Sequence, residues 1–332
     1  MIVRDATVAD AGAIEHVARA SWTDTYRDIF DSAYIDDFLE RAYATDALAS
    51  AAERAVERDD AHLLVAERDG QVVAFAQFGI GPRGPELCRI YAHPTAYGSG
   101  AGSALLAELH RRLEGKVESY VLDVHPDNER GRAFYDRNGF VVAGVGATPD
   151  CHLMLRRILS PPRVSLPIET DRLRLRALTD ADAERLHEIY GDRETMRYVG
   201  ASGEPRPDLE ATRRVLDWLR RHDALHGFGM WAVDERNGEQ LVGVAGLLWV
   251  EGHGPDVEAA YLLRRDRWGR GYATEALHGV LDAGRSIGLE RIVALSYPEN
   301  RASQRVMTKA GMRAAGTSTA YGREMTLHVS ER

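Results

Sequence analysis

Two glycine-rich stretches of the chain have the spacing of a phosphate-binding loop. Residues 97–103 read YGSGAGS and residues 268–274 read WGRGYAT, and each lies between an apolar run and an apolar-periodic helix. Glycines leave backbone N–H groups uncovered, and the following helix N-terminus adds partial positive charge, so these stretches can hold phosphate oxygens. The sequence therefore predicts a phosphate-bearing cofactor. The predicted loop residues are Tyr97, Gly98, Gly100, Ala101, Gly102, Ser103, Trp268, Gly269, Gly271, Tyr272, Ala273 and Thr274.

Other landmarks recur with the glycine stretches. Asn300 follows Asn128 by 172 residues, and Gly311 follows Gly139 by the same interval. The 332 residues are enough for two domains of about 150 residues, each with its own core. Residues 160–167 contain three prolines and predict a stiff, extended connector. The chain is therefore predicted to be a tandem repeat, with domains at 1–159 and 168–332 and a linker at 160–167.

Bulk composition excludes some classes of function. The formal net charge of −9 argues against a general nucleic-acid binder and slightly favours small cationic substrates. The longest apolar run, residues 241–250, is half of the roughly 20 residues that cross a bilayer. The first residues lack a basic region followed by an apolar stretch. We expect a soluble, cytoplasmic chain that binds neither nucleic acid nor membrane.

The order of elements predicts an α/β fold in each half. The first half reads as a strand, two helical regions, a hairpin across Asp69-Gly70, a strand at 85–94 and the glycine loop with its helix. A strand at 121–124, a helix at 128–138 and closing strands at 140–143 and 152–155 follow. The second half repeats the hairpin across Asn237-Gly238. This order is typical of a mixed sheet flanked by helices.

The motifs of the first half resemble those of the GNAT superfamily of acetyl-coenzyme A-dependent N-acetyltransferases. They are Leu87-x-x-Ile90-Tyr91-x-x-Pro94, the three glycines after it, Asn128, and the runs Ala133-Phe134-Tyr135 and Asn138-Gly139-Phe140. The family's loop begins with Gln or Arg, where this chain has Tyr97. The resemblance implies two tandem GNAT-type domains, each with a mixed, mostly antiparallel central sheet flanked by helices, and acetyl-coenzyme A as cofactor.

The resemblance also implies roles in the first half. The backbone of Ile90, Tyr91 and Ala92 would hold the pantetheine arm, which lies like an extra strand between two splayed strands. Asn128 would hydrogen-bond near that arm, although it could equally cap the helix that it opens. Tyr135 would protonate the departing thiolate, or its ring only packs. Glu86 is the candidate base and would relay the proton of the substrate ammonium through water.

The second half is similar to the GNAT branch that acetylates protein N-termini and aminoglycoside-like or amino-acid amines. Its loop matches that branch closely, and Leu262, Leu263 and Asn300 take the cofactor positions. Met307 stands where the first half has Tyr135, and a thioether cannot donate a proton. Ser303 is the candidate in its place, or simply an early helix residue. Glu258 is the candidate base.

The acceptor is predicted to be an amine, either a small polyamine-like molecule or a peptide N-terminus. Between Asp24 and Glu40 six acids outnumber the single Arg27. This stretch is either a solvated helix face or an acidic mouth that attracts a cation. Whether both halves bind cofactor and catalyse, and whether the chain is a monomer or a homodimer, stays open.

Two other classes of protein fit the motifs less well. The run Gly98-x-Gly100-x-x-Ser103, with Asp123 about 20 residues on, partly matches a dinucleotide fingerprint, but the third glycine is missing. A non-catalytic acyl-coenzyme A sensor is the other alternative. No metal is predicted, since the pair His222 and His226 lacks the glutamate of a zinc-protease helix and is interpreted as a solvated helix end.

Overall fold

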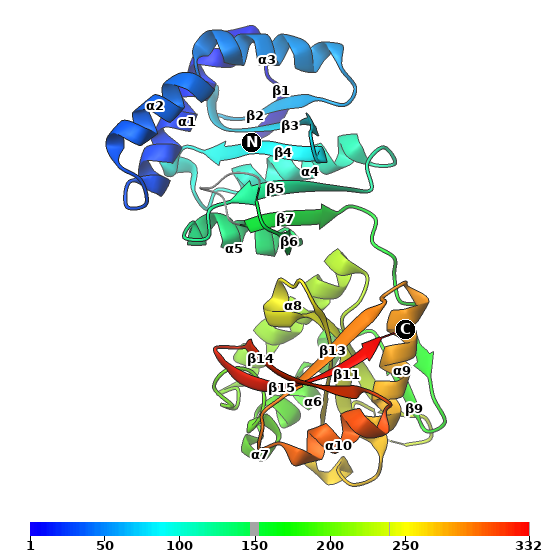
Figure 1. The fold of residues 1–332 in the computed structure, drawn as a ribbon. Helices are drawn as coiled ribbons and strands as arrows, with labels where there is room; N and C mark the ends of the chain where they lie inside the picture. The colour runs from blue at the N-terminus through cyan, green and yellow to red at the C-terminus, as the bar shows by residue number, and fades with distance from the viewer. Residues whose placement is uncertain (147–152, 239, 332) are drawn as a thin grey trace. The chain divides into compact units, whose positions relative to one another are not determined.

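The computed structural model describes residues 1–146, 153–238 and 240–331 and divides into two compact units (Figure 1). The units are Met1–Ser160 and Pro161–Arg332, so the division along the chain falls in the proline-rich stretch. The predicted closing strand 152–155 begins at His152, which lies outside the described residues.

The first unit is a seven-stranded sheet in the order β1-β2-β3-β4-β5-β7-β6. All neighbouring strands run antiparallel except β4 and β5. Asp69 and Gly70 both have positive φ at the predicted hairpin turn. The strands are β1 (Ile2–Asp5), β2 (His62–Arg68), β3 (Gln71–Gly81), β4 (Gly84–Ala92), β5 (Ser119–Val124), β6 (Phe140–Gly144) and β7 (Leu153–Ile158). The helices are α1 (Ala11–Tyr26), α2 (Ser32–Ala42), α3 (Thr45–Glu57), α4 (Ala101–Leu113) and α5 (Glu129–Arg137).

The second unit repeats this plan in an eight-stranded sheet, in the order β14-β15-β13-β12-β11-β10-β9-β8. The mixed, mostly antiparallel sheets confirm the predicted α/β class. The strands are β8 (Ile168–Glu169), β9 (Leu173–Arg176), β10 (Met230–Glu235), β11 (Gly243–Trp249), β12 (Val257–Leu263), β13 (Arg291–Ser296), β14 (Arg313–Ala320) and β15 (Arg323–Glu331). The helices are α6 (Ala183–Tyr190), α7 (Arg193–Met196), α8 (Leu209–His226), α9 (Tyr272–Ser286) and α10 (Arg301–Lys309).

Each sheet opens between its two parallel strands. Strands β4 and β5 pair only at Glu86 and Val121 among the described residues, although β4 continues for six residues beyond Glu86. Strands β12 and β13 likewise pair only at Glu258 and Val293. Beyond these points no strand within the described residues pairs with the facing edges of β4 and β12, and each strand leads through a short 3-10 helix into a glycine loop. An extended ligand can therefore pair with either edge.

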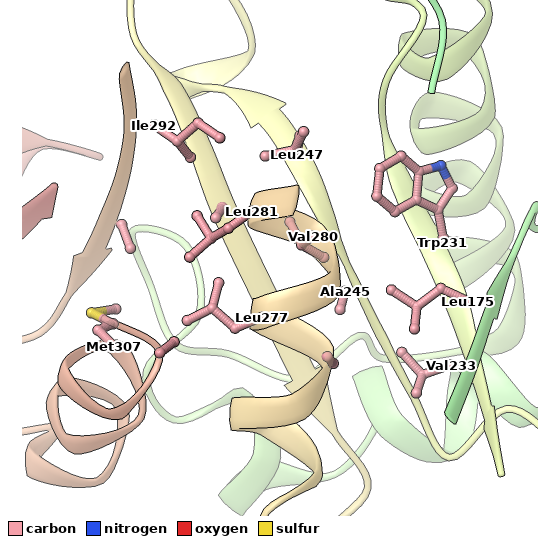
Figure 2. Close-up of a cluster of buried hydrophobic side chains, with 14 of the residues drawn as sticks. Leu175, Trp231, Val233, Ala245, Leu247, Leu277, Val280, Leu281, Ile292 and Met307 are labelled. Atoms are coloured by element: carbon pink, nitrogen blue, oxygen red, sulfur yellow. The ribbon is translucent and has the colours of Figure 1, made fainter. Parts of the chain in front are cut away.

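The apolar face of α9 anchors the second unit's core. Leu277, Val280 and Leu281 pack against the sheet, and Met307 of α10 lies in the same cluster (Figure 2). Met307 is only 2% exposed. Val164 joins this cluster from the proline-rich stretch, and its N–H donates to the carbonyl of Gly227 at 2.8 Å. Part of the stretch predicted as a linker therefore packs onto the second unit.

The interpretation of His222 as part of a solvated helix end is wrong. Its side chain is buried, with the residue 4% exposed. Its Nδ1 lies 3.0 Å from the carbonyl oxygen of Phe228, and its Nε2 accepts the N–H of Trp249 at 3.2 Å. Burial lowers the pKa of His222 to about 4, so the ring is neutral and joins α8 to the start of β10 and the end of β11.

Candidate active site

A cavity of about 1260 Å³ lies in the second unit. Its wall is made by the open edge of β12, the first turns of α9 and α10, and residues of α7 and α8. The cofactor and chemical residues predicted for the second half all line it. They are Glu258, Leu262, Leu263, Trp268, Gly269, Gly271, Tyr272, Ala273, Thr274, Asn300 and Ser303.

The glycine loop of this cavity is shaped to hold an anion. Gly269 and Gly271 have φ of +76° and +80°, in the left-handed region that favours glycine. Gly271 is the N-cap of α9, so the N–H groups of the helix's first turn have no acceptor within the helix. A Cβ added to Gly269 would meet no atom within 4 Å. The loop therefore offers bare amides beside open space, which fits a cofactor pyrophosphate.

The first unit builds the same loop. Gly98 and Gly100 have φ of +74° and +85°, and Gly100 is the N-cap of α4. Ala101, Gly102 and Ser103 form the first turn of that helix. Tyr97 precedes them, and the guanidinium carbon of Arg130 lies 4.3 Å from the centre of its ring. Ile90, Tyr91 and Ala92 end β4 along its open edge.

Glu258 lies where β12 and β13 separate, facing the cavity. The residue is 8% exposed, and the hydroxyl of Tyr321 donates to its Oε2 at 2.6 Å. Burial raises the pKa of Glu258 to about 7, against the lowering effect of the Tyr321 hydrogen bond. A carboxyl that titrates near neutral pH is suited to take a proton from an amine.

Glu86 occupies the equivalent register in the first unit but has different neighbours. Its carboxylate accepts a hydrogen bond from Arg83 at 3.2 Å. The same guanidinium binds both carboxylate oxygens of Asp123 at 2.9 Å. The Glu86 side chain is 21% exposed. A partly solvated carboxylate that already faces a fixed cation is less suited to neutralise an incoming ammonium.

The hydroxyl groups of Tyr261 and Ser303 lie close together, and Ser303 is one turn before Met307 on α10. The Tyr261 hydroxyl lies 2.7 Å from Ser303 Oγ and donates to the Ser303 carbonyl at 3.1 Å. Burial raises the pKa of Tyr261 to about 12, which keeps its phenol protonated at neutral pH. Both residues line the cavity. Because the thioether of Met307 cannot donate a proton, this hydroxyl pair is the candidate proton donor near that part of α10.

The two asparagines cap helices. Asn128 Oδ1 accepts the N–H of Gly131 at 2.8 Å, and Asn300 Oδ1 accepts the N–H of Ser303 at 3.1 Å. The amide of Asn128 also donates to the Tyr26 hydroxyl at 3.3 Å. The capping interpretation of Asn128 thus has a direct structural basis.

The ring of Tyr135 packs between aromatic neighbours on α5 and β6. Its centroid lies 5.5 Å from that of Phe134 and 5.3 Å from that of Phe140. The side chain is half-buried. The packing interpretation therefore holds for the ring, and the role of its hydroxyl as an acid stays a prediction.

The acidic stretch of the first unit is engaged by arginines. Arg130 binds Asp24 at 2.7 Å, and the Asp31 carboxylate accepts the N–H of Tyr34 as a helix cap. Two further pairs lie on the surface, Arg19 with Asp36 at 3.3 Å and Arg41 with Asp37 at 2.6 Å. These contacts favour the solvated helix face over an acidic mouth.

Sequence reasoning missed Tyr261 and Tyr321. Tyr261 lies inside the apolar run before the second glycine loop, and its first-unit counterpart is Arg89, so no repeated motif marks it. Tyr321 has φ of +55° in the turn between β14 and β15. The dipeptide Tyr321-Gly322 indicates a turn, but the contact with Glu258 joins residues 63 apart in the chain.

Both units match known acetyltransferases. Residues 20–140 match the acetyltransferase (GNAT) family, and residues 172–313 match the acetyltransferase (GNAT) domain. YoaA of Bacillus subtilis, an uncharacterized N-acetyltransferase, is 29% identical over 158 residues, covering 46% of this chain and 86% of that protein. The spermidine N(1)-acetyltransferase of Thermoplasma acidophilum is 30% identical over 141 residues, covering 42% of this chain and 88% of that protein.

Among solved structures, the PaiA N-acetyltransferase of Thermoplasma acidophilum, in complex with coenzyme A, is 26% identical. The match covers 47% of this chain and 98% of that one, with a TM-score of 0.44. The chain belongs to the GNAT family of acetyltransferases, with one domain of the family in each unit, and is an acetyl-coenzyme A-dependent N-acetyltransferase. Among the helices within the described ranges, none has both the length and the apolar character that crossing a bilayer requires.

Proposed function

We propose that the second unit transfers the acetyl group of acetyl-coenzyme A to a primary amine inside the 1260 Å³ cavity. The observation that carries the proposal is Glu258, a buried carboxyl with a pKa of about 7 at the point where β12 and β13 separate. The relative that is named a spermidine acetyltransferase supports an amine as acceptor. The acceptor is a small-molecule amine or a peptide N-terminus.

The cavity has a place for each part of the cofactor. The first-turn amides of α9, after Gly269 and Gly271, would hold the pyrophosphate. The open edge at Leu262 and Leu263 would pair with the pantetheine arm. The cofactor supplies a thioester that is already activated, so the protein needs only to position it and to move protons.

The proton movements are assigned to Glu258 and to the hydroxyl pair of Ser303 and Tyr261. Glu258 accepts the proton that the substrate ammonium must lose before the nitrogen can attack. The Ser303 hydroxyl donates a proton to the departing thiolate, and the Tyr261 hydroxyl, 2.7 Å away, passes its own proton to Ser303. Asn300 keeps Ser303 in place by capping α10.

The first unit is proposed to bind the cofactor through its own glycine loop, the edge of β4 and Asn128. Glu86 as base and Tyr135 as acid stay proposals there. The Arg83 contact of Glu86 supports the view that this unit contributes the smaller share of turnover. We propose two domains, at residues 1–159 and 168–332; the two compact units support this number of domains, although they divide between Ser160 and Pro161.

The proposal is tested by mixing the full chain with acetyl-coenzyme A and a panel of primary amines. Thiol release and the mass of the acetylated amine are the readouts. We expect both signals for at least one amine. Tight coenzyme A binding without acetyl transfer to any amine would contradict the proposal and favour a non-catalytic acyl-coenzyme A sensor.

Removing the hydroxyl of Ser303 tests the proposed proton donor. Ser303→Ala is expected to lower kcat by about a hundredfold, because general acid catalysis contributes at least that much. Coenzyme A affinity, measured by calorimetry, is expected to stay unchanged. Ser318→Ala, outside the cavity lining, is the matched control. An unaltered kcat in Ser303→Ala would remove this residue from the mechanism.

The pH dependence of turnover tests the base. Because only the ionised carboxylate accepts a proton, kcat/KM is expected to rise about tenfold per pH unit below pH 7 and to level off above it. Tyr321→Phe removes a hydrogen bond that lowers the pKa of Glu258. The rising limb is therefore expected to move to higher pH in this variant. If the rising part of the kcat/KM profile stayed at the same pH in Tyr321→Phe, a group other than Glu258 would control it.

A further inference from the structure

The cavity wall away from the glycine loop is rich in cations. Arg197 follows α7, Arg206 precedes α8, and Arg214 lies on α8; all three line the cavity. Tyr198 and Trp218 lie among them. This region, which we call the arginine wall, faces the same cavity as Glu258.

Arg206 has a buried donor without an acceptor. Its Nε is shielded from solvent and has no hydrogen-bond partner in the described chain. Its backbone is fixed, because its N–H donates to the Tyr190 carbonyl at 2.7 Å. The Tyr297 hydroxyl donates to the Gly200 carbonyl at 2.7 Å and holds the same loop. A guanidinium that is held in a cavity wall with an unsatisfied N–H is suited to receive an anion.

Among the described residues, two of the three carboxylates in the lining are hydrogen-bonded to Tyr321, and six cationic side chains line the same cavity. Glu258 accepts the Tyr321 hydroxyl at 2.6 Å, and Glu251 accepts the Tyr321 N–H at 2.5 Å. Glu194, exposed on α7, is the remaining carboxylate of the lining. A guanidinium nitrogen of Arg214 lies 3.8 Å from a carboxylate oxygen of Glu210, a residue that does not line the cavity. The arginine wall therefore carries an excess of positive charge.

A second buried donor lines the same cavity. The indole Nε1 of Trp249 is shielded from solvent and lacks an acceptor among the described residues. Each buried N–H without an acceptor is costly unless a ligand supplies one. Arg206 and Trp249 are residues of the same lining, and their unsatisfied N–H groups favour a bound molecule that carries hydrogen-bond-accepting oxygens.

We propose that the acceptor of the second unit is an amino acid, whose amine faces Glu258 and whose carboxylate binds Arg206. This inference rests on the proposed function of the same cavity. A guanidinium matches a carboxylate with two parallel N–H groups, so one residue fixes both position and orientation. A polyamine, in contrast, would bring positive charge against three arginines.

The test compares amino acids with the amines that lack their carboxylate. The pairs are L-tryptophan with tryptamine and L-leucine with 3-methylbutylamine, and spermidine is added as a polycation. The full chain, Arg206→Gln and Arg213→Gln are assayed by thiol release, and L-tryptophan binding is measured by calorimetry in the presence of coenzyme A. Arg213 is exposed on α8 and outside the cavity lining, which makes it the matched control.

We expect kcat/KM of the wild type to favour each amino acid over its partner amine by about tenfold or more, as a hydrogen-bonded charge pair allows. Arg206→Gln should abolish this preference by lowering kcat/KM for the amino acids, and Arg213→Gln should leave it intact. L-tryptophan binding that is lost in Arg206→Gln supports the inference even if no turnover is seen.

Three results would overturn the inference. The first is a wild type that acetylates spermidine or the decarboxylated amines as well as the amino acids, which would leave the proposed function standing. The second is an unchanged preference in Arg206→Gln. The third is weakened coenzyme A binding in that variant, which would assign Arg206 to a cofactor phosphate instead.

Discussion

Glu258→Gln is expected to lower kcat for acetyl transfer at neutral pH by about 10²- to 10⁴-fold, the range of general base catalysis. Glutamine keeps the size of the side chain and can still accept the Tyr321 hydroxyl, but it cannot take a proton. Thiol release at saturating acetyl-coenzyme A is the measurement. Glu290→Gln, an exposed change in the same unit, is the control. A kcat equal to that of the wild type would exclude Glu258 as the base.

The thermal stability of Glu258→Gln distinguishes loss of the catalytic base from damage to the fold. Folding raises the pKa of Glu258 from 4.5 to about 7. Between these values the folded chain binds more protons than the unfolded chain, so stability falls as pH rises through this window. Glu258→Gln removes that loss and is expected to be at least as stable as the wild type at pH 7, measured by thermal unfolding. A marked loss of stability would indicate a structural role.

Gly271→Glu is expected to weaken coenzyme A binding to the second unit by about a hundredfold or more. The substitution forces a side chain into a left-handed backbone position and places a carboxylate beside the helix N-terminus that would hold the phosphates. A Cβ at Gly271 meets only the Arg172 side chain, at 3.4 Å, so the protein itself has room. Calorimetric titration with coenzyme A measures the loss.

Two matched variants complete the Gly271→Glu comparison. Gly271→Ala carries the same backbone penalty without the charge, so it is expected to lose less affinity. Gly100→Glu makes the equivalent change in the first unit, where a Cβ meets no atom within 4 Å. Each glutamate variant should remove only its own unit's binding. Unchanged coenzyme A affinity in Gly271→Glu would exclude this loop as the phosphate site.

The sequence predicted the features that depend on neighbouring residues. The first hairpin turns at the predicted dipeptide Asp69-Gly70, whereas β10 ends at Glu235 and β11 begins only at Gly243, so the second is not the tight turn predicted at Asn237-Gly238. The loops follow from glycines next to an amphipathic helix. The tandem plan follows because Asn128 and Asn300 recur at a fixed interval. Each of these features can be recognised from the order of residues along the chain, without knowledge of how the side chains pack.

The features that the sequence could not predict depend on contacts between distant residues. Glu86 and Glu258 look alike in the sequence, yet Arg83 and Asp123 surround one while Tyr321 covers the other. His222 was misjudged for the same reason, since its partners belong to other elements. The environment of a side chain is set by the elements that pack against it, and this decides its chemistry.

The two domains therefore share one backbone arrangement but differ in the side chains of the site. In both, parallel strands separate after one paired position and lead into a glycine loop. In the second, a buried carboxyl and a hydroxyl pair face one cavity. The shared backbone arrangement supports our proposal that either unit binds cofactor, and the side chains support our assignment of turnover to the second unit.

The most direct test of that assignment is the acetyl-transfer rate of Gly100→Glu and of Gly271→Glu, measured by thiol release with the same amine. The account predicts that Gly100→Glu keeps most of the wild-type rate and that Gly271→Glu loses nearly all of it. The reverse pattern would place the acetyltransferase in the first unit and contradict the assignment of Glu258 as its base.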